Sequence, residues 1–169
     1  MKILVVVDMQ NDFIDGALGS LEAQKIVPYV KSVIEHFDGK VYFTRDTHFD
    51  DYIDTQEGKN LPVPHCIKDT LGWQIHPERD KIRKTKPIDK ITFGSKELVE
   101  VLKEEKDIES ITFIGLCTDI CVISNVMIVK AFYPEIPLIV DALGCAGVTT
   151  ASHKTALSAM KACQIKIIN

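Results

Sequence analysis

Apolar residues follow two patterns along the chain. Short continuous apolar runs occupy residues 2–7, 40–44, 111–114, 136–140 and 165–168. Such runs predict strands of a parallel sheet that are buried on both faces. Apolar residues at a helical spacing occupy residues 20–36, 95–105, 119–132 and 151–161, and they predict helices that bury one face. Residues 81–86 are more polar and predict an edge strand.

The expected helix boundaries rest on a few polar residues. Ser20 and Ser95 precede the first two helices and are the expected N-caps, while Thr118 or Asp119 is expected to cap the third. Pro28 marks a point at which the first helix can kink or break.

Strands and helices alternate over the whole chain of 169 residues. This order predicts an α/β fold with a doubly wound, mostly parallel sheet of about six strands. Neither a repeat, a low-complexity tract nor a linker interrupts the pattern. Because the length suits one core, we expect a single domain over residues 1–169.

Polar side chains follow several of the expected strands. Asp8 ends the first strand, Asp46 and His48 follow the second, and Cys121 follows the strand that Gly115 terminates. The carboxyl ends of neighbouring parallel strands lie together, so these side chains are expected to converge. Cys121 would also lie in the first turn of a helix, where N–H groups favour a thiolate. The alternative is that Cys121 simply packs in the core, as free cysteines usually do.

Residues 49–80 show no sustained periodicity. An irregular segment of that length inside a compact domain is usually functional or disordered. It contains Glu57, His65, Cys66, Trp73 and His76.

Composition excludes several classes of function. The net charge is −4, and the lysines and arginines are scattered, so binding to nucleic acid or to an anionic membrane is not expected. The apolar start is too short to span a membrane, and no cleavage site follows it. Five cysteines without a secretion signal favour reduced thiols and a cytoplasmic protein.

Several short motifs occur in a fixed order over essentially the whole chain. They are Val5-Val-Val-Asp-Met-Gln-Asn-Asp-Phe13, Thr44-Arg-Asp-Thr-His48, Pro64-His-Cys66, the Lys90 loop that ends in Phe93-Gly-Ser95, and Gly115-Leu-Cys-Thr-Asp-Ile-Cys-Val122. Together they resemble the isochorismatase-like cysteine hydrolases. The resemblance implies a six-stranded parallel sheet with helices on both faces.

The same resemblance implies a catalytic set. Cys121 matches the nucleophile, Asp8 the base and Lys90 the lysine, with Lys86 and Lys96 as nearby alternatives to Lys90. This combination is chemically workable, because a cation favours the thiolate and a carboxylate accepts its proton. A cis peptide before Cys117 is also implied, with the backbone N–H groups of Cys117 and Cys121 as the oxyanion hole.

A metal site is implied by similarity to the nicotinamidase/pyrazinamidase branch of that family. The matching ligands are Asp46, His48, Glu57 and His65, with Asp54 as the substitute for Glu57. Carboxylate and imidazole ligands suit one divalent ion, for which zinc is the first expectation and iron or manganese the alternatives. The competing interpretation is that Glu57 and its acidic neighbours form only a solvated loop.

The reaction implied by the resemblance is hydrolysis of nicotinamide to nicotinate and ammonia, as in NAD salvage. The pyridine nitrogen would bind the metal, Cys121 would form a thioester, and Phe13 would stack on the ring. A second aromatic of the family is replaced by Pro62, so Trp73 or Tyr52 is the expected substitute.

Other functions remain open from the sequence. Within the family, the alternative substrate is another small amide or a vinyl ether such as isochorismate. Cys117 and Cys121 as a redox or metal pair is a weaker hypothesis, because the spacing is C-x3-C and no second pair exists. A noncatalytic binding protein is a further alternative. Since relatives often form dimers or tetramers, a homo-oligomer is compatible with the sequence. The remaining cysteines, Cys66, Cys145 and Cys163, are expected to pack as small apolar groups.

Overall fold

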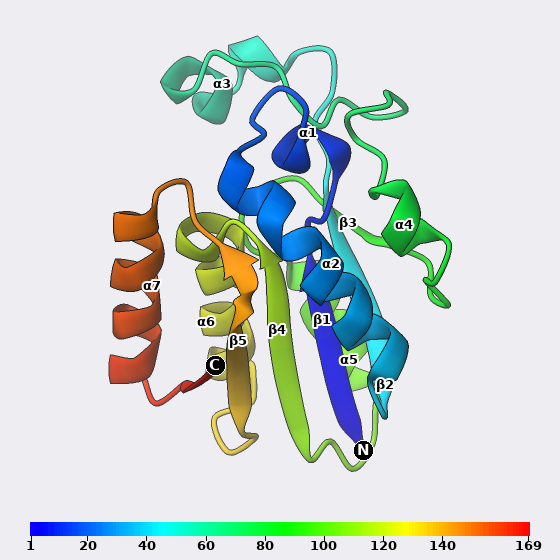
Figure 1. Ribbon diagram of the computed structural model, residues 1–169, viewed down its shortest axis with the longest axis vertical. Helices are drawn as coiled ribbons and strands as arrows, with labels where there is room; N and C mark the ends of the chain where they lie inside the picture. Colours follow the sequence, from blue (N-terminus) through cyan, green and yellow to red (C-terminus); the bar gives the residue numbers. More distant parts are fainter.

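A six-stranded parallel sheet forms the centre of the protein (Figure 1). The computed structural model describes residues 1–78 and 80–169. Within them the strands lie in the order β3-β2-β1-β4-β5-β6, and each neighbouring pair is parallel. The doubly wound α/β prediction is therefore confirmed. The strands are β1 (Lys2–Val7), β2 (Lys40–Asp46), β3 (Ile88–Lys90), β4 (Ser110–Leu116), β5 (Leu138–Ala146) and β6 (Lys166–Ile168).

The strand order reverses between β1 and β4. From β1 the chain builds the sheet outward through β2 to β3, and then returns to place β4 on the other side of β1. At such a switch point the two following connections leave on opposite faces, which opens a crevice at the carboxyl ends of the strands.

Helices cover both faces of the sheet. The described helices are α1 (Asn11–Ile14), α2 (Leu21–His36), α3 (Gln56–Asn60), α4 (Pro77–Asp80), α5 (Lys96–Lys103), α6 (Ile123–Phe132) and α7 (Thr150–Ala162), with a 3-10 turn η1 (Tyr52–Asp54) and a π-helical turn η2 (Thr118–Val122). No helix among the described residues is both long and apolar enough to cross a membrane.

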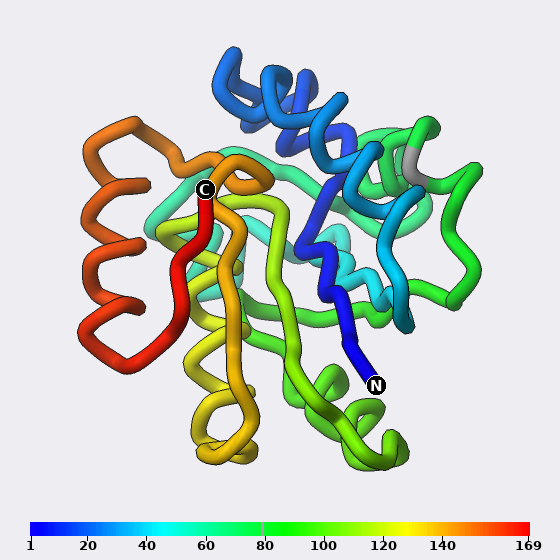
Figure 2. Tube along the Cα trace, turned by 60° about the horizontal axis from the view of Figure 1, so that its bottom comes forward, coloured from blue at the N-terminus to red at the C-terminus, as the bar shows by residue number. Residues whose placement is uncertain are grey.

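The two faces bury alternate residues of each strand. Leu4 and Val6 of β1 pack with the α2 side chains, whereas Ile3 and Val5 pack with α5, α6 and α7 on the other face. Figures 1 and 2 show α2 on one side of the sheet and α5 and α6 on the other. This two-sided burial explains the continuous apolar runs in the sequence.

Two predicted N-caps are confirmed. The Ser20 hydroxyl accepts a hydrogen bond from the Ala23 amide at 3.0 Å, and the Ser95 hydroxyl accepts one from the Leu98 amide at 3.0 Å. Pro28 lies inside α2 without ending it.

The predicted edge strand over residues 81–86 is wrong. The outer strand is instead β3, in which Ile88 pairs with Thr44 and Lys90 with Asp46. The segment before β3 forms a turn instead, in which the Arg83 guanidinium donates hydrogen bonds to the Asp80 carboxylate and to the Thr85 carbonyl.

The predicted cap of the third helix is also wrong. The turn η2 precedes α6, which begins at Ile123. Thr118 contacts His153 through its hydroxyl, and Asp119 accepts a hydrogen bond from the Val148 amide at 3.1 Å. Both side chains therefore tie η2 to the segment that leads into α7.

Candidate active site and metal centre

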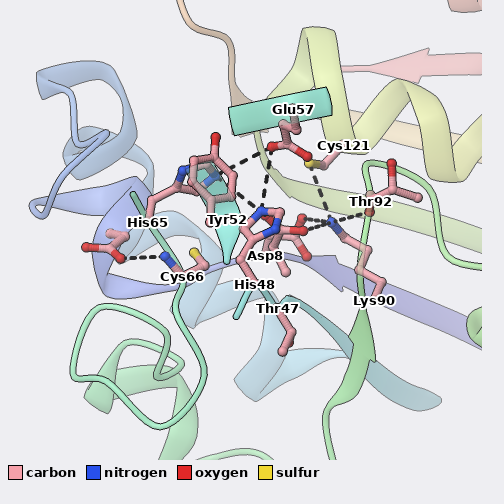
Figure 3. A network of polar contacts seen from close by, with 12 residues as sticks. Asp8, Thr47, His48, Tyr52, Glu57, His65, Cys66, Lys90, Thr92 and Cys121 are labelled. Atoms are coloured by element: carbon pink, nitrogen blue, oxygen red, sulfur yellow. Dashed lines mark hydrogen bonds and ion pairs between the residues drawn. The ribbon is translucent and has the colours of Figure 1, made fainter. Parts of the chain in front are cut away.

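Polar side chains from four neighbouring strands meet at the carboxyl edge of the sheet (Figure 3). Asp8 follows β1 directly, Asp46 ends β2, and Lys90 ends β3. Cys121 lies in η2, which follows β4. The convergence expected from the sequence is therefore present in the structure.

Lys90 joins these groups. Its ammonium lies 2.7 Å from Asp8 Oδ2, 3.0 Å from Asp46 Oδ1 and 3.6 Å from Cys121 Sγ, and it donates to the Thr92 carbonyl at 3.0 Å. The Lys90 residue is 1% exposed, whereas Lys86 and Lys96 are exposed at the surface. Lys90 is thus the lysine that the fold places beside the thiol.

Burial dominates the protonation of this group. Desolvation raises the pKa of the Cys121 thiol well above its usual value, and the nearby Lys90 charge offsets only part of that effect. Desolvation also raises the pKa of Asp8 against the pull of Lys90. Burial opposes the charge on Lys90, but Asp8, Cys121 and Asp46 together hold its pKa well above the ordinary value. Burial thus favours the neutral form of the thiol, while the neighbouring acidic groups favour the charged form of Lys90.

The backbone fixes the position of Asp8. Its φ is +47°, in the left-handed region that few residues other than glycine adopt. The Thr44 hydroxyl donates to Asp8 Oδ1 at 2.7 Å, and the Asp8 amide donates to the Thr44 carbonyl at 3.3 Å. These contacts turn the carboxylate toward Lys90.

Gly115 permits β4 to approach β1 closely. A Cβ at this position would lie 2.0 Å from the Val7 carbonyl oxygen, and its φ is +125°. The Leu116–Cys117 peptide bond that follows is cis, as the resemblance implied. The thiol-bearing turn therefore begins directly beside the end of β1.

Four side chains that could hold a metal ion cluster next to Lys90. The ligand atoms of Asp46, His48, Glu57 and His65 all lie within 4.8 Å of one another. His48 Nε2 is 3.0 Å from Asp46 Oδ2, and His65 Nε2 is 3.7 Å from Glu57 Oε1. Asp54, the substitute for Glu57, is exposed and lies outside the cluster.

The residues around these ligands fit a bound ion. His65 Nδ1 lies 2.8 Å from the Val63 carbonyl, which leaves Nε2 facing the cluster. Backbone contacts of this kind orient metal-binding imidazoles. Tyr52 packs against both rings, with centroids 4.7 Å from His48 and 5.0 Å from His65. Two imidazoles and two carboxylates suit zinc, iron or manganese.

The thiol and the ligand cluster open into one small cavity of about 50 Å³. Its lining includes Cys117, Cys121, Asp46, Glu57 and His65, together with the apolar side chains of Phe13, Leu18, Leu61, Phe93 and Ile120. A ligand in this space would touch the sulfur, the carboxylates of the cluster and the ring of Phe13.

Neither expected substitute for the second aromatic lines this cavity. Trp73 donates its indole N–H to the Thr47 hydroxyl at 2.9 Å and carries the Arg45 guanidinium 3.4 Å from its ring centre. Tyr52 donates its hydroxyl to the Leu61 carbonyl, and its ring packs against His48 and His65. The second aromatic of the lining is Phe93, which was not predicted as a substrate-binding residue.

The contact that ties η2 to α7 was also not predicted from the sequence. Thr118 is fully buried, and its hydroxyl oxygen lies 2.8 Å from His153 Nδ1 on α7. Only the pairing of η2 with the start of α7 reveals this contact. Cys66 and Cys145 are buried as expected, but Cys163 is exposed at the end of α7, so its predicted packing role is wrong.

A parallel α/β sheet that presents a buried thiol, a lysine and a carboxylate beside a cluster of imidazole and carboxylate side chains has the architecture of a cysteine hydrolase. Residues 2–169 match the isochorismatase domain, and the chain belongs to this family.

Three similar proteins within this family are named as nicotinamidases or pyrazinamidases. The nicotinamidase/pyrazinamidase of Mycobacterium tuberculosis is 26% identical over 145 residues, which cover 72% of this chain and 75% of that protein. The crystal structure of a nicotinamidase from Bacillus subtilis is 27% identical, covers 99% of both chains and superposes with a TM-score of 0.82. A Pyrococcus horikoshii pyrazinamidase in complex with zinc is 25% identical, with a TM-score of 0.82 and coverage of 99% and 98%.

Proposed function

We propose that the protein hydrolyses nicotinamide to nicotinate and ammonia through a thioester on Cys121. The observation that carries this proposal is the Lys90 contact network, which joins the thiol to Asp8 at the wall of a cavity that also holds carboxylate and imidazole ligands. The names of the relatives with this fold support the choice of an amide substrate.

Cys121 and Asp8 share the proton transfers. Asp8 accepts the thiol proton as the sulfur attacks the carboxamide carbon, and it then donates that proton to the departing ammonia. In the second half, Asp8 takes a proton from the water that attacks the thioester and returns it to the departing sulfur, which restores the thiol. The nicotinic acid formed loses its proton to solvent and leaves as nicotinate. Burial raises the pKa of Asp8 toward the working pH, which suits a group that must both accept and donate a proton.

Lys90 and two backbone amides stabilise the negative charge that develops in these steps. The Lys90 ammonium stabilises the thiolate as it forms, because it lies 3.6 Å from the sulfur. The N–H groups of Cys117 and Cys121 are the proposed donors to the oxygen of the tetrahedral intermediate. Donors held in place before reaction stabilise such charge most effectively.

The walls of the cavity orient the ring. Phe13 and Phe93 supply apolar contact, and Asp46, His48, Glu57 and His65 are the proposed ligands of one divalent ion, zinc before iron or manganese. Such an ion supplies a Lewis-acid position for the pyridine nitrogen.

We also propose a cytoplasmic location. The five cysteines are free thiols, as expected in a reducing compartment. A small amide is the proposed partner of the site, and a homo-oligomer stays a prediction.

The direct test is ammonia release from nicotinamide by the purified protein, before and after chelation and metal restoration. Release should disappear with the metal and return with it. Cys121→Ala should abolish release while the bound metal, measured by elemental analysis, stays at the wild-type level. Absence of release from metal-loaded, folded protein contradicts the nicotinamide assignment and points to another small amide or a vinyl ether.

A further inference from the structure

A second cavity of about 620 Å³ opens beside the one that contains the thiol. Four residues line both spaces and form the boundary between them: Glu57, Leu61, Phe93 and Ile120. The outer cavity is further lined by His48, Thr55, Gln56, Asn60, Ile91 and Thr92. Its volume lies within the range of about 300–1,000 Å³ typical of small-molecule sites, whereas the inner cavity alone is far smaller.

Two side chains of the boundary, Leu61 and Phe93, are partly exposed and can change rotamer. Leu61 is 38% exposed at the end of α3, and Phe93 is 41% exposed in the loop after β3. Pro62 stands where the resemblance places the second ring-clamping aromatic, and it lines neither cavity.

The lining of the outer cavity defines the chemistry of its occupant. Leu61, Ile91 and Phe93 form an apolar wall, and Ile91 is 68% exposed although it is a large aliphatic residue. The lining also includes the neutral polar side chains of Gln56 and Asn60. The lining contains neither lysine nor arginine, and its ionisable side chains, His48 and Glu57, belong to the proposed metal cluster.

We propose that the outer cavity receives an uncharged, apolar substituent on the ring of an aromatic carboxamide, and that the enzyme therefore hydrolyses substituted nicotinamides larger than nicotinamide itself. The carboxamide lies at Cys121 in the inner cavity, and the substituent passes between Leu61 and Phe93 to contact Ile91. This inference rests on the proposed amide hydrolysis and extends its range of substrates.

The test compares kcat/KM for nicotinamide and 5-phenylnicotinamide in the metal-loaded enzyme. We expect the phenyl compound to reach at least about a tenth of the nicotinamide value, because burial of its ring offsets the cost of displacing side chains. A 5-carboxylate on nicotinamide serves as the charged control. Its kcat/KM should be more than about a hundredfold below that of nicotinamide, because the carboxylate would lie against Leu61, Ile91 and Phe93 and lose its hydration there.

Ile91→Asp tests the outer wall. This change should lower the ratio of kcat/KM for 5-phenylnicotinamide to that for nicotinamide by about tenfold, because it replaces the apolar contact with a charge. The matched control is Ile53→Asp, since Ile53 is also an exposed isoleucine, at 46%, and lines neither cavity. The control should leave the ratio unchanged.

The outcomes separate this inference from the proposed function. Hydrolysis of nicotinamide without hydrolysis of the phenyl compound, or a ratio that Ile91→Asp leaves unchanged, overturns the inference alone. Hydrolysis of the phenyl compound without hydrolysis of nicotinamide overturns the nicotinamide assignment alone. Calorimetry with Cys121→Ala gives the comparison without turnover, and binding of nicotinamide but not of the phenyl compound again overturns the inference.

Discussion

The ammonium of Lys90 lies 2.7 Å from the Asp8 carboxylate, and both side chains are fully buried. The same ammonium contacts Asp46 at 3.0 Å, so one cation balances two buried carboxylates. A buried charge without its partner is costly, so this lysine has a structural role as well as the proposed catalytic one.

Lys90→Met should therefore lower the free energy of unfolding by about 3–5 kcal/mol and abolish hydrolysis. Urea unfolding followed by circular dichroism measures the first effect. Lys96→Met is the matched control, because Lys96 is exposed, and its effect should stay within about 0.5 kcal/mol. Equal stability of the two variants would show that Asp8 and Asp46 do not need the cation.

Glu57→Gln should weaken divalent metal binding by at least about tenfold, because it replaces a charged ligand in the cluster with a neutral amide. Competition with a chelator of known affinity measures this change. Asp54→Asn removes a carboxylate from the neighbouring exposed turn and should leave the affinity unchanged. The reverse pattern would make Asp54 the ligand.

Gly115→Ala should destabilise the protein by about 3 kcal/mol, because the added methyl group meets the Val7 carbonyl and the φ of +125° is unfavourable for alanine. Gly94→Ala is the control, since there the added carbon meets only the end of the Ile128 side chain, which can rotate away. Thermal unfolding compares the two. Similar melting temperatures would contradict the close approach of β1 and β4.

The contact between Tyr42 and Glu105 predicts a pH dependence of stability away from the site. Hydrogen bonds from Lys40, and then from Tyr42, lower the pKa of Glu105, so its contribution is present above the unfolded-state pKa and is lost as the pH falls through the folded value. Burial raises the pKa of Tyr42 to about 12, so its contribution is present below about pH 10 and is lost between 10 and 12.

Tyr42→Phe removes the alkaline titration of this pair. The free energy of unfolding should therefore decline less steeply between pH 10 and 12 in the variant than in the wild-type protein. Urea unfolding at a series of pH values measures the slope. An unchanged slope would mean that Tyr42 ionises with the same pKa in the folded and unfolded chains.

The strands and most helices could be predicted from the sequence, because burial on two faces leaves continuous apolar runs. The predicted strand over residues 81–86 was wrong, because composition does not show which segment pairs with β2. Ile88 and Lys90 are buried against β2 in β3. Residues 81–86 instead form a turn in which Arg83 contacts Asp80. Such pairings depend on contacts between distant segments.

Most of the site was predicted through motifs, but Phe93 was not. Its loop is held by Asn125 on α6, which donates to the Phe93 carbonyl at 3.1 Å and to the Cys121 carbonyl at 2.8 Å. The same Asn125 accepts a hydrogen bond from the Ser95 amide at 3.0 Å. One buried amide thus sets the position of the loop relative to the thiol, and nothing in the local sequence around Phe93 indicates that contact.

The strand order also divides the site between two continuous pieces of chain. Residues 2–90 build β1, β2 and β3 and carry Asp8, Lys90 and the four proposed metal ligands, whereas residues 110–168 build β4, β5 and β6 and carry Cys121. If the chain were cut between α5 and β4, neither fragment would hold a complete reaction centre. Turnover from the mixed fragments would then report the docking of the two halves, in which β4 pairs with β1 and β5 packs against α2.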